Sequence, residues 1–296
     1  SGLAALFGRS LSGTSGHFVD IIAVVATILG VSVTIGFGVS QFAAGMFNIS
    51  GAAWMINADG SSSNTGMLVS LVIVMGAATL SARSGVGKGI KWLSNINMGL
   101  SFFLLAFFLI FGSTMLALES LFVGIWDYVV TLPESVTTVW QKDGTEVGDS
   151  LAGWQNGWTV FYWAWWVSWS PFVGMFIARI SRGRTIREFI IAVLLVPTAV
   201  TLLWMSSFGI SALEQAQNGI GSLAEGVDGA TVSLATFQML ENLPLNQITT
   251  ALGIVLVMVF FVTSSDSGSL VIDSITAGGK LDAPTPQRIF WAVLQG

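Results

Sequence analysis

Long apolar runs alternate along this chain with shorter polar connections. Six of the runs approach or exceed the roughly 20 residues that a helix needs to cross a bilayer. They lie at about 18–47, 66–82, 98–118, 156–178, 188–211 and 248–264, and a seventh begins near 288. The pattern predicts an all-α integral membrane protein in which residues 1–296 form a single transmembrane domain.

Composition supports a membrane protein and argues against an enzyme. Charged residues make up 9% of the chain and mean hydropathy is +0.78, whereas soluble domains carry about 25% charged residues. The chain has no cysteine and one histidine, His17. A cysteine nucleophile, a thiolate metal site and a histidine cluster are therefore excluded, and we expect neither an enzyme nor an organic cofactor.

The connections alternate in charge from one apolar run to the next. Ten of the eleven Lys and Arg residues lie before residue 18 and in the segments 83–97, 179–187 and 271–288. The other connections, 48–65, 119–153 and 212–247, hold one basic residue, Lys142, and eleven acidic residues. The positive-inside rule places the first set in the cytoplasm and the second outside, as expected for a multi-pass protein of the cell membrane.

Several connections carry features of their own. We expect a surface helix within 119–153 and a short helix at about 231–242. The glycine-rich loop 84–90 lacks the Gly-Lys-Ser/Thr ending of a phosphate loop, which argues against nucleotide binding. The basic residues after the fourth run set topology and are expected to attract anionic lipid rather than nucleic acid. They are Arg179, Arg182, Arg184 and Arg187.

Aromatic residues are concentrated in the fourth apolar run. Six of the twelve tryptophans lie between Trp154 and Trp169. Tryptophan usually anchors a span near the headgroups, but this cluster reaches into the middle of the run. At 3.6 residues per turn one stripe of rings is predicted, with Trp163 off it. The stripe comprises Trp158, Tyr162, Trp165, Trp166, Trp169, Phe172 and Phe176.

A proline lies inside this aromatic run. Pro171 removes one backbone hydrogen bond, and Ser168, Ser170 and Gly174 flank it. These residues predict a broken helix at mid-membrane, the kind of element from which secondary transporters build substrate sites. Clustered indole faces attract a quaternary ammonium cation. The alternative is an aromatic seam that packs helix against helix.

A second group of polar residues follows the last complete run. Five of the seven residues 263–269 bear hydroxyls, and Asp266 lies among them. Hydroxyl and carbonyl oxygens suit an alkali cation, so this segment is a candidate ion site. Alternatively, the hydroxyls bond back to carbonyls one turn earlier, and Asp266 lies at the wet end of the span.

The chain resembles the betaine/carnitine/choline transporter family. The resemblance is carried by the run from Phe161 to Phe176, by the basic segment from Ala178 to Phe189, and by three further segments in the family order. These three are Asp20 to Thr27, Ser84 to Ile90, and Thr263 to Ser267. The resemblance implies part of an inverted-repeat fold of five plus five helices. It also implies that this chain is an internal piece covering the fifth to tenth spans and the start of the eleventh.

The resemblance also implies roles for particular residues. Trp165, Trp166 and Trp169, with Trp163 and Phe161 close by, would form an aromatic box around the trimethylammonium group. Phe172 and Phe176 would line the substrate route. Thr263 and Ser264, with the carbonyl of Phe260, would supply half of a sodium site. Thr27 and Phe172 would belong to a second sodium site.

Two departures from the family qualify these roles. The family's glycine-rich broken helix and a further span with aromatic box residues lie upstream of the matched region, so the present piece alone is not expected to transport. Sodium-coupled members also have two threonines one turn apart on the first span here. This chain has Thr27 followed by Val31, although Ser32 or Thr34 lies close enough to compensate.

These features together favour sodium-coupled symport of glycine betaine or a related quaternary ammonium solute by alternating access. The alternative on the same fold is sodium-independent exchange of carnitine, choline or betaine. A membrane enzyme, a receptor with an aromatic cage and a channel are less compatible with the sequence. The family resemblance further implies a homotrimer.

Overall fold

The protein is almost entirely helical. The structure is a computed structural model that describes residues 7–11, 13–84, 89–280 and 283–296. The long helices are α2 (Thr14–Ser50), α3 (Asn64–Ser84), α4 (Gly89–Phe111), α5 (Thr114–Thr137), α6 (Glu146–Ile180), α8 (Val196–Gln217) and α10 (Asn246–Thr276). The short elements are η1 (Gly8–Leu11), η2 (Ala53–Met55), α7 (Ile186–Ile190), η3 (Ile191–Leu195), η4 (Ser222–Glu225), α9 (Ala235–Glu241) and α11 (Thr285–Leu294). The predicted all-α class is confirmed.

Within the described part, six helical segments are long and apolar enough to cross a membrane. They are Thr14–Ser50, Asn64–Arg83, Lys91–Phe111, Thr114–Thr137, Ile186–Gln217 and Asn246–Thr276. This set differs from the predicted one at two helices. It includes α5, which the sequence suggested would lie on the surface, and omits the aromatic helix α6, whose tryptophans carry polar N–H groups.

Two predicted spans have different boundaries in the structure. The run at 98–118 is divided, because α4 ends at Phe111 and α5 starts at Thr114. The Thr114 hydroxyl donates to the carbonyl of Leu109 and so satisfies one of the last carbonyls of α4. The run at 248–264 is too short, because α10 continues to Thr276. The expected helix at 231–242 is present as α9, and residues 85–88 of the glycine-rich loop lie outside the described residues.

Helix α2 lies at the centre of the packing and contacts α3, α6 and α10. Its glycines allow the close approach. A Cβ atom on Gly38 would lie 2.3 Å from the Phe261 ring of α10, and one on Gly45 would lie 2.6 Å from Phe237 of α9. Small residues commonly permit such close contacts between membrane helices.

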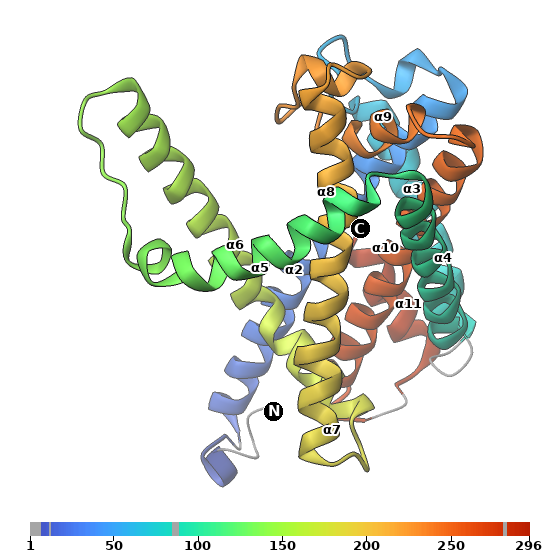
Figure 1. Cartoon of the computed structure of the whole chain (residues 1–296). Coiled ribbons are helices and arrows are strands. Elements are labelled where there is room, and N and C mark those ends of the chain that lie inside the picture. Colours follow the sequence, from blue (N-terminus) through green and yellow to red (C-terminus); the bar gives the residue numbers. More distant parts are fainter. Residues whose placement is uncertain (1–6, 12, 85–88, 281–282) are drawn as a thin grey trace.

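The two ends of the helix bundle differ in charge. Figure 1 shows α7 and the start of α2 at the lower end, and α9 and the connection between α2 and α3 at the upper end. The basic connections near α7 and the acidic connections near α9 therefore lie at opposite ends, as the charge pattern predicts. At the upper end, hydrogen bonds from Ser61 hold the pKa of Asp59 below its usual value. Hydrogen bonds from Thr231 likewise hold the pKa of Asp228 below its usual value.

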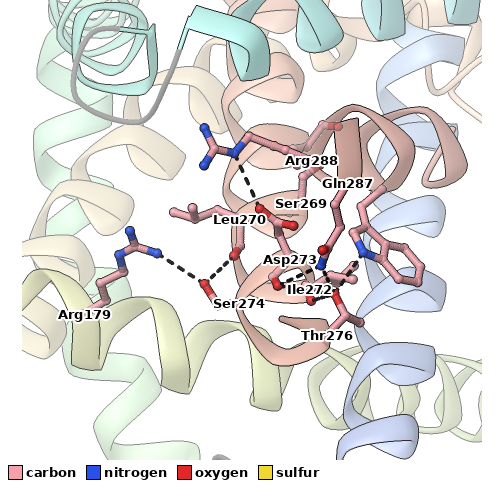
Figure 2. Close-up of polar contacts among 11 residues, drawn as sticks. Arg179, Ser269, Leu270, Ile272, Asp273, Ser274, Thr276, Gln287 and Arg288 are labelled. Atoms are coloured by element: carbon pink, nitrogen blue, oxygen red, sulfur yellow. Dashed lines mark hydrogen bonds and ion pairs between the residues drawn. The ribbon is translucent and has the colours of Figure 1, made fainter. Parts of the chain in front are cut away.

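Polar contacts join three helices at the lower end of α10 (Figure 2). Arg288 Nε of α11 lies 3.5 Å from Asp273 Oδ2, and both side chains are largely buried. Gln287 Nε2 donates to the Thr276 hydroxyl at 2.7 Å. On the other side of α10, Arg179 of α6 donates to the Ser274 hydroxyl at 3.3 Å. These contacts fix α11 and the end of α6 against α10.

The Asp273–Arg288 pair generates a stability prediction. Replacing Arg288→Met leaves a buried carboxylate without its cation, which should destabilise the fold by roughly 3 kcal/mol. The measurement is thermal unfolding of the purified complete protein that carries this chain. Arg182→Met is the matched control because Arg182 is exposed. Equal unfolding temperatures for the two variants would contradict the assigned role of the pair.

Candidate functional site

The aromatic helix α6 is continuous through Pro171, so the predicted break is wrong. The helix extends from Glu146 to Ile180 with Pro171 inside it. Pro171 has no N–H to donate to the carbonyl of Val167, four residues earlier. The Ser170 hydroxyl donates to that carbonyl instead, at 2.8 Å. The serine before the proline thus replaces the missing backbone hydrogen bond, and no break is needed.

A ladder of ring contacts follows one face of α6. Successive centroids lie 5.4 Å apart for Phe161 and Trp165, 6.4 Å for Trp165 and Trp169, and 5.3 Å for Trp169 and Phe172. The ladder continues from Phe172 to Phe176 at 6.0 Å. Towards the start of α6, Trp158 and Tyr162 also join it. The predicted stripe therefore exists, with Phe161 added and without Trp166.

Helix α2 forms the second wall of this ladder. Phe37 lies 6.0 Å from Phe161 and 6.1 Å from Trp165 between ring centroids. The Trp165 indole N–H donates to the Thr34 hydroxyl at 3.2 Å. Gly30 faces Trp169 so closely that a Cβ atom would lie 2.6 Å from its ring. These three α2 residues are spaced by about one helical turn and share one face.

The predicted box residues fall into two groups. Phe161, Trp165 and Trp169 are half-buried between α6 and α2. Trp163 and Trp166 are each 69% exposed and lie on other faces of α6. Residues 165 and 166 differ by about 100° around the helix axis, so the two indoles cannot share one face. Trp163 and Trp166 would meet a solute only with a surface outside the described residues.

A shallow hollow opens where the ladder approaches the start of α6. It has a volume of about 420 Å³ and is bounded by aromatic rings and by two glycines of α6. Its lining residues are Phe37, Gly153, Trp154, Gly157, Trp158 and Phe161. Sequence reasoning missed Phe37, Gly153 and Gly157. Gly153 and Gly157 are four residues apart, a spacing that places them on one helix face and was a detectable signal.

One ring of the ladder has an unused hydrogen-bond donor. The Trp169 Nε1 atom is buried and has no partner within the described part of the chain. Buried indole N–H groups usually find a partner, and leaving one unpaired costs free energy. The Trp169 N–H is therefore a buried donor that lies against Gly30 of α2.

The hydroxyl-rich segment of α10 presents oxygens at its half-buried positions. The Thr263 hydroxyl donates to the carbonyl of Phe260 at 2.9 Å. The Ser264 hydroxyl is half-buried and makes no hydrogen bond with the described residues. Thr263 and Ser264 are adjacent, and the Phe260 carbonyl lies one turn earlier. The three predicted ligands are thus close together along one helix.

The rest of the segment is more buried than the sequence suggested. Asp266 is 3% exposed and accepts a hydrogen bond from Ser81 of α3, so it does not lie at a wet end. Ser267 and Ser269 donate back to carbonyls four residues earlier, at 2.8 and 2.9 Å. Because these hydroxyls are satisfied locally, the polar stretch packs inside the bundle as a helix.

The residues of the second predicted ion site are deeply buried. Thr27 is 0% exposed and donates to the carbonyl of Ala23 at 2.7 Å. Phe172 packs between α2 and α10 in a cluster with Val24 and Ile272, against which Phe176 also packs. Val31 is buried beside Gly268 of α10. Within the described residues, no group of three or more His, Cys, Asp or Glu side chains is placed to hold a metal ion.

Comparisons with known proteins agree with this architecture. Residues 1–296 match the family model described as BCCT, betaine/carnitine/choline family transporter. A glycine betaine/proline/choline transporter of Vibrio parahaemolyticus is 46% identical over 291 residues, 98% of this chain and 49% of that protein. The glycine betaine transporter OpuD of Bacillus subtilis is 39% identical over 297 residues, 100% of this chain and 54% of that protein.

The apolar helices and these similarities define a multi-pass membrane protein of a transporter family. The chain belongs to the betaine/carnitine/choline transporter family. It spans about half the length of the curated relatives that it matches.

The close approach of α2 to α6 generates a prediction for Gly30. Gly30→Ala places a methyl group 2.6 Å from the Trp169 ring and 2.7 Å from the Ser168 hydroxyl. Such overpacking costs about 1–3 kcal/mol and should push Trp169 out of the ladder. We expect a lower unfolding temperature of the complete protein, measured by thermal unfolding.

Gly36→Ala is the matched control for this experiment. Gly36 lies on the same helix, and a Cβ atom there would meet nothing within 4 Å. An unchanged unfolding temperature in Gly30→Ala, or an equal decrease in Gly36→Ala, would show that the contact at Gly30 does not constrain the packing of α2 against α6.

Proposed function

We propose that the complete protein carrying this chain is a sodium-coupled symporter. Its solute is glycine betaine or a related quaternary ammonium compatible solute, moved by alternating access. The observation that carries this proposal is the continuous ring ladder of α6, closed on one side by Phe37 and Thr34 of α2. Relatives that share its sequence are named as glycine betaine transporters.

The ladder suits a trimethylammonium group for a specific reason. The group is cationic but has no N–H to donate, so it gains little from hydrogen-bond acceptors. Aromatic faces attract it through their quadrupoles, at about 2 kcal/mol or more per ring when the contact is desolvated. Trp163 and Trp166 remain proposed substrate-binding residues, on exposed faces of α6 that lie outside the ladder.

Sodium coupling is supported by the oxygens of α10. The Ser264 hydroxyl has no protein partner among the described residues, and the Thr263 hydroxyl and Phe260 carbonyl lie within one turn of it. Hard oxygen ligands such as these suit an alkali cation. Thr27 and Phe172 are the proposed residues of a second sodium site. There the Thr27 hydroxyl would have to exchange its bond to Ala23 for the ion.

A sodium-independent exchanger is the second candidate, and one observation favours it. By the family resemblance, Val31 occupies the position at which sodium-coupled members have a threonine. Its side chain packs against Gly268 of α10 and supplies only methyl groups there. Uptake that ignores sodium but rises with internal carnitine or betaine would establish exchange.

The remaining proposals concern the membrane and the assembly. We propose that the end of α6 and α7 face the cytoplasm, and that Arg179, Arg182, Arg184 and Arg187 attract anionic lipid. We also propose a homotrimer. Helix α5 supports this assembly, because it exposes Phe122, Trp126 and Val129 and has an apolar surface that another subunit would cover.

The transport experiment is uptake of labelled glycine betaine by the complete protein in proteoliposomes, with and without an inward sodium gradient. Accumulation above equilibrium only with the gradient is the expected result, because sodium supplies the driving force. Uptake that is equal in both conditions would reject symport.

A ligand variant of the sodium site gives a separate prediction. Ser264→Ala removes an oxygen ligand, so the sodium concentration for half-maximal uptake should rise at least tenfold. Thr198→Ala on α8 is the control, because its hydroxyl only donates to the carbonyl of Leu194. An unchanged sodium requirement in Ser264→Ala would remove Ser264 from the site.

A further inference from the structure

The hydroxyl of Thr34 connects the aromatic ladder to the backbone of α2. Trp165 Nε1 donates to Thr34 Oγ1 at 3.2 Å, and Thr34 Oγ1 in turn donates to the carbonyl of Gly30 at 3.1 Å. Thr34 is 7% exposed, so little water competes for these bonds. The donation to Gly30 orients the hydroxyl so that a lone pair faces the indole.

Trp165 is the ring whose orientation matters most within the ladder. It contacts Phe37 on α2 and three aromatic rings of α6, which are Phe161, Tyr162 and Trp169. It is also the indole of the ladder whose N–H is fixed to another helix, whereas the Trp169 N–H has no partner within the described residues. A rotation of Trp165 would therefore disturb contacts on both sides of it.

We propose that Thr34 is a positioning residue for the quaternary ammonium site, acting through Trp165. By accepting the indole N–H, Thr34 holds the ring so that its face is presented to the cation before the solute arrives. Such preorganisation raises affinity because less side-chain freedom is lost on binding. This inference rests on the proposed function and adds a residue outside the aromatic set.

The experiment must distinguish the positioning role of Thr34 from a role as a sodium ligand. The Thr34 oxygen retains a second lone pair, which is able to coordinate a sodium ion. The two roles differ in what they depend on. The positioning role requires the N–H of Trp165, whereas a sodium ligand acts whether or not residue 165 has an N–H.

The first test compares Thr34→Val with Thr34→Ser in the complete protein. Valine has nearly the shape of threonine but accepts no hydrogen bond, so glycine betaine should bind about fivefold more weakly, as loss of one hydrogen bond implies. Serine keeps the acceptor and should restore binding to within about twofold. Thr79→Val on α3 is the matched control, because the Thr79 hydroxyl only donates to the carbonyl of Met75.

The second test is a double-mutant cycle with Trp165→Phe, read out by calorimetry and by the sodium concentration that gives half-maximal uptake. Phenylalanine keeps an aromatic ring but has no N–H, so Thr34→Val should have no further effect on betaine affinity in that background. The sodium requirement should be the same in wild type and Thr34→Val.

The outcomes separate the inference from the proposed function. A full effect of Thr34→Val in the Trp165→Phe background, or a raised sodium requirement, would overturn the positioning role. Wild-type affinity in Thr34→Val would also overturn it. If the wild-type protein binds no quaternary ammonium solute at all, the proposed function fails first.

Discussion

The close packing of α2 against its neighbours is the constraint on which the site depends. Gly30 lets α2 approach the Trp169 ring of α6, and Gly38 lets it approach the Phe261 ring of α10. A side chain at either position would separate the helices. The same helix therefore packs against both the aromatic ladder of α6 and the hydroxyl segment of α10. This shared neighbour supports the proposed coupling, since solute and ion would have to sense the same conformational change.

Polar groups inside this bundle are mostly satisfied within their own helices. The Ser170 hydroxyl takes over the carbonyl that Pro171 leaves without a donor, and Ser267 and Ser269 of α10 donate to carbonyls one turn earlier. The helices consequently remain intact where the sequence suggests a break or a wet end. Among the described residues, the exceptions include the buried Trp169 N–H, the buried Ser265 hydroxyl and the half-buried Ser264 hydroxyl.

The sequence predicted the helical class, the charge difference between the two ends and the aromatic stripe, because these follow from local composition and from the 3.6-residue period. It did not predict that α6 passes through Pro171, since this depends on the Ser170 rotamer. The sequence pattern also placed Trp166 in the stripe, although the adjacent residues Trp165 and Trp166 point about 100° apart around the helix axis. The sequence did not predict that Thr34, Phe37 and Gly30 contact the aromatic ladder, since these contacts depend on how α2 packs against α6. The sequence likewise did not predict that α4 and α5 are separate helices, because one apolar run covers the junction. There the Thr114 hydroxyl donates to a C-terminal carbonyl of α4.

The central claim is that the ladder recognises positive charge rather than apolar shape. The most direct measurement compares the affinity of the complete protein for glycine betaine with that for tert-butylacetate, in which carbon replaces the quaternary nitrogen. The two ligands have the same shape and the same carboxylate. Cation–π binding predicts that tert-butylacetate, whose tert-butyl group carries no charge, binds at least tenfold more weakly. Equal or tighter binding of tert-butylacetate would show that the ladder is merely an apolar surface, and would contradict this account.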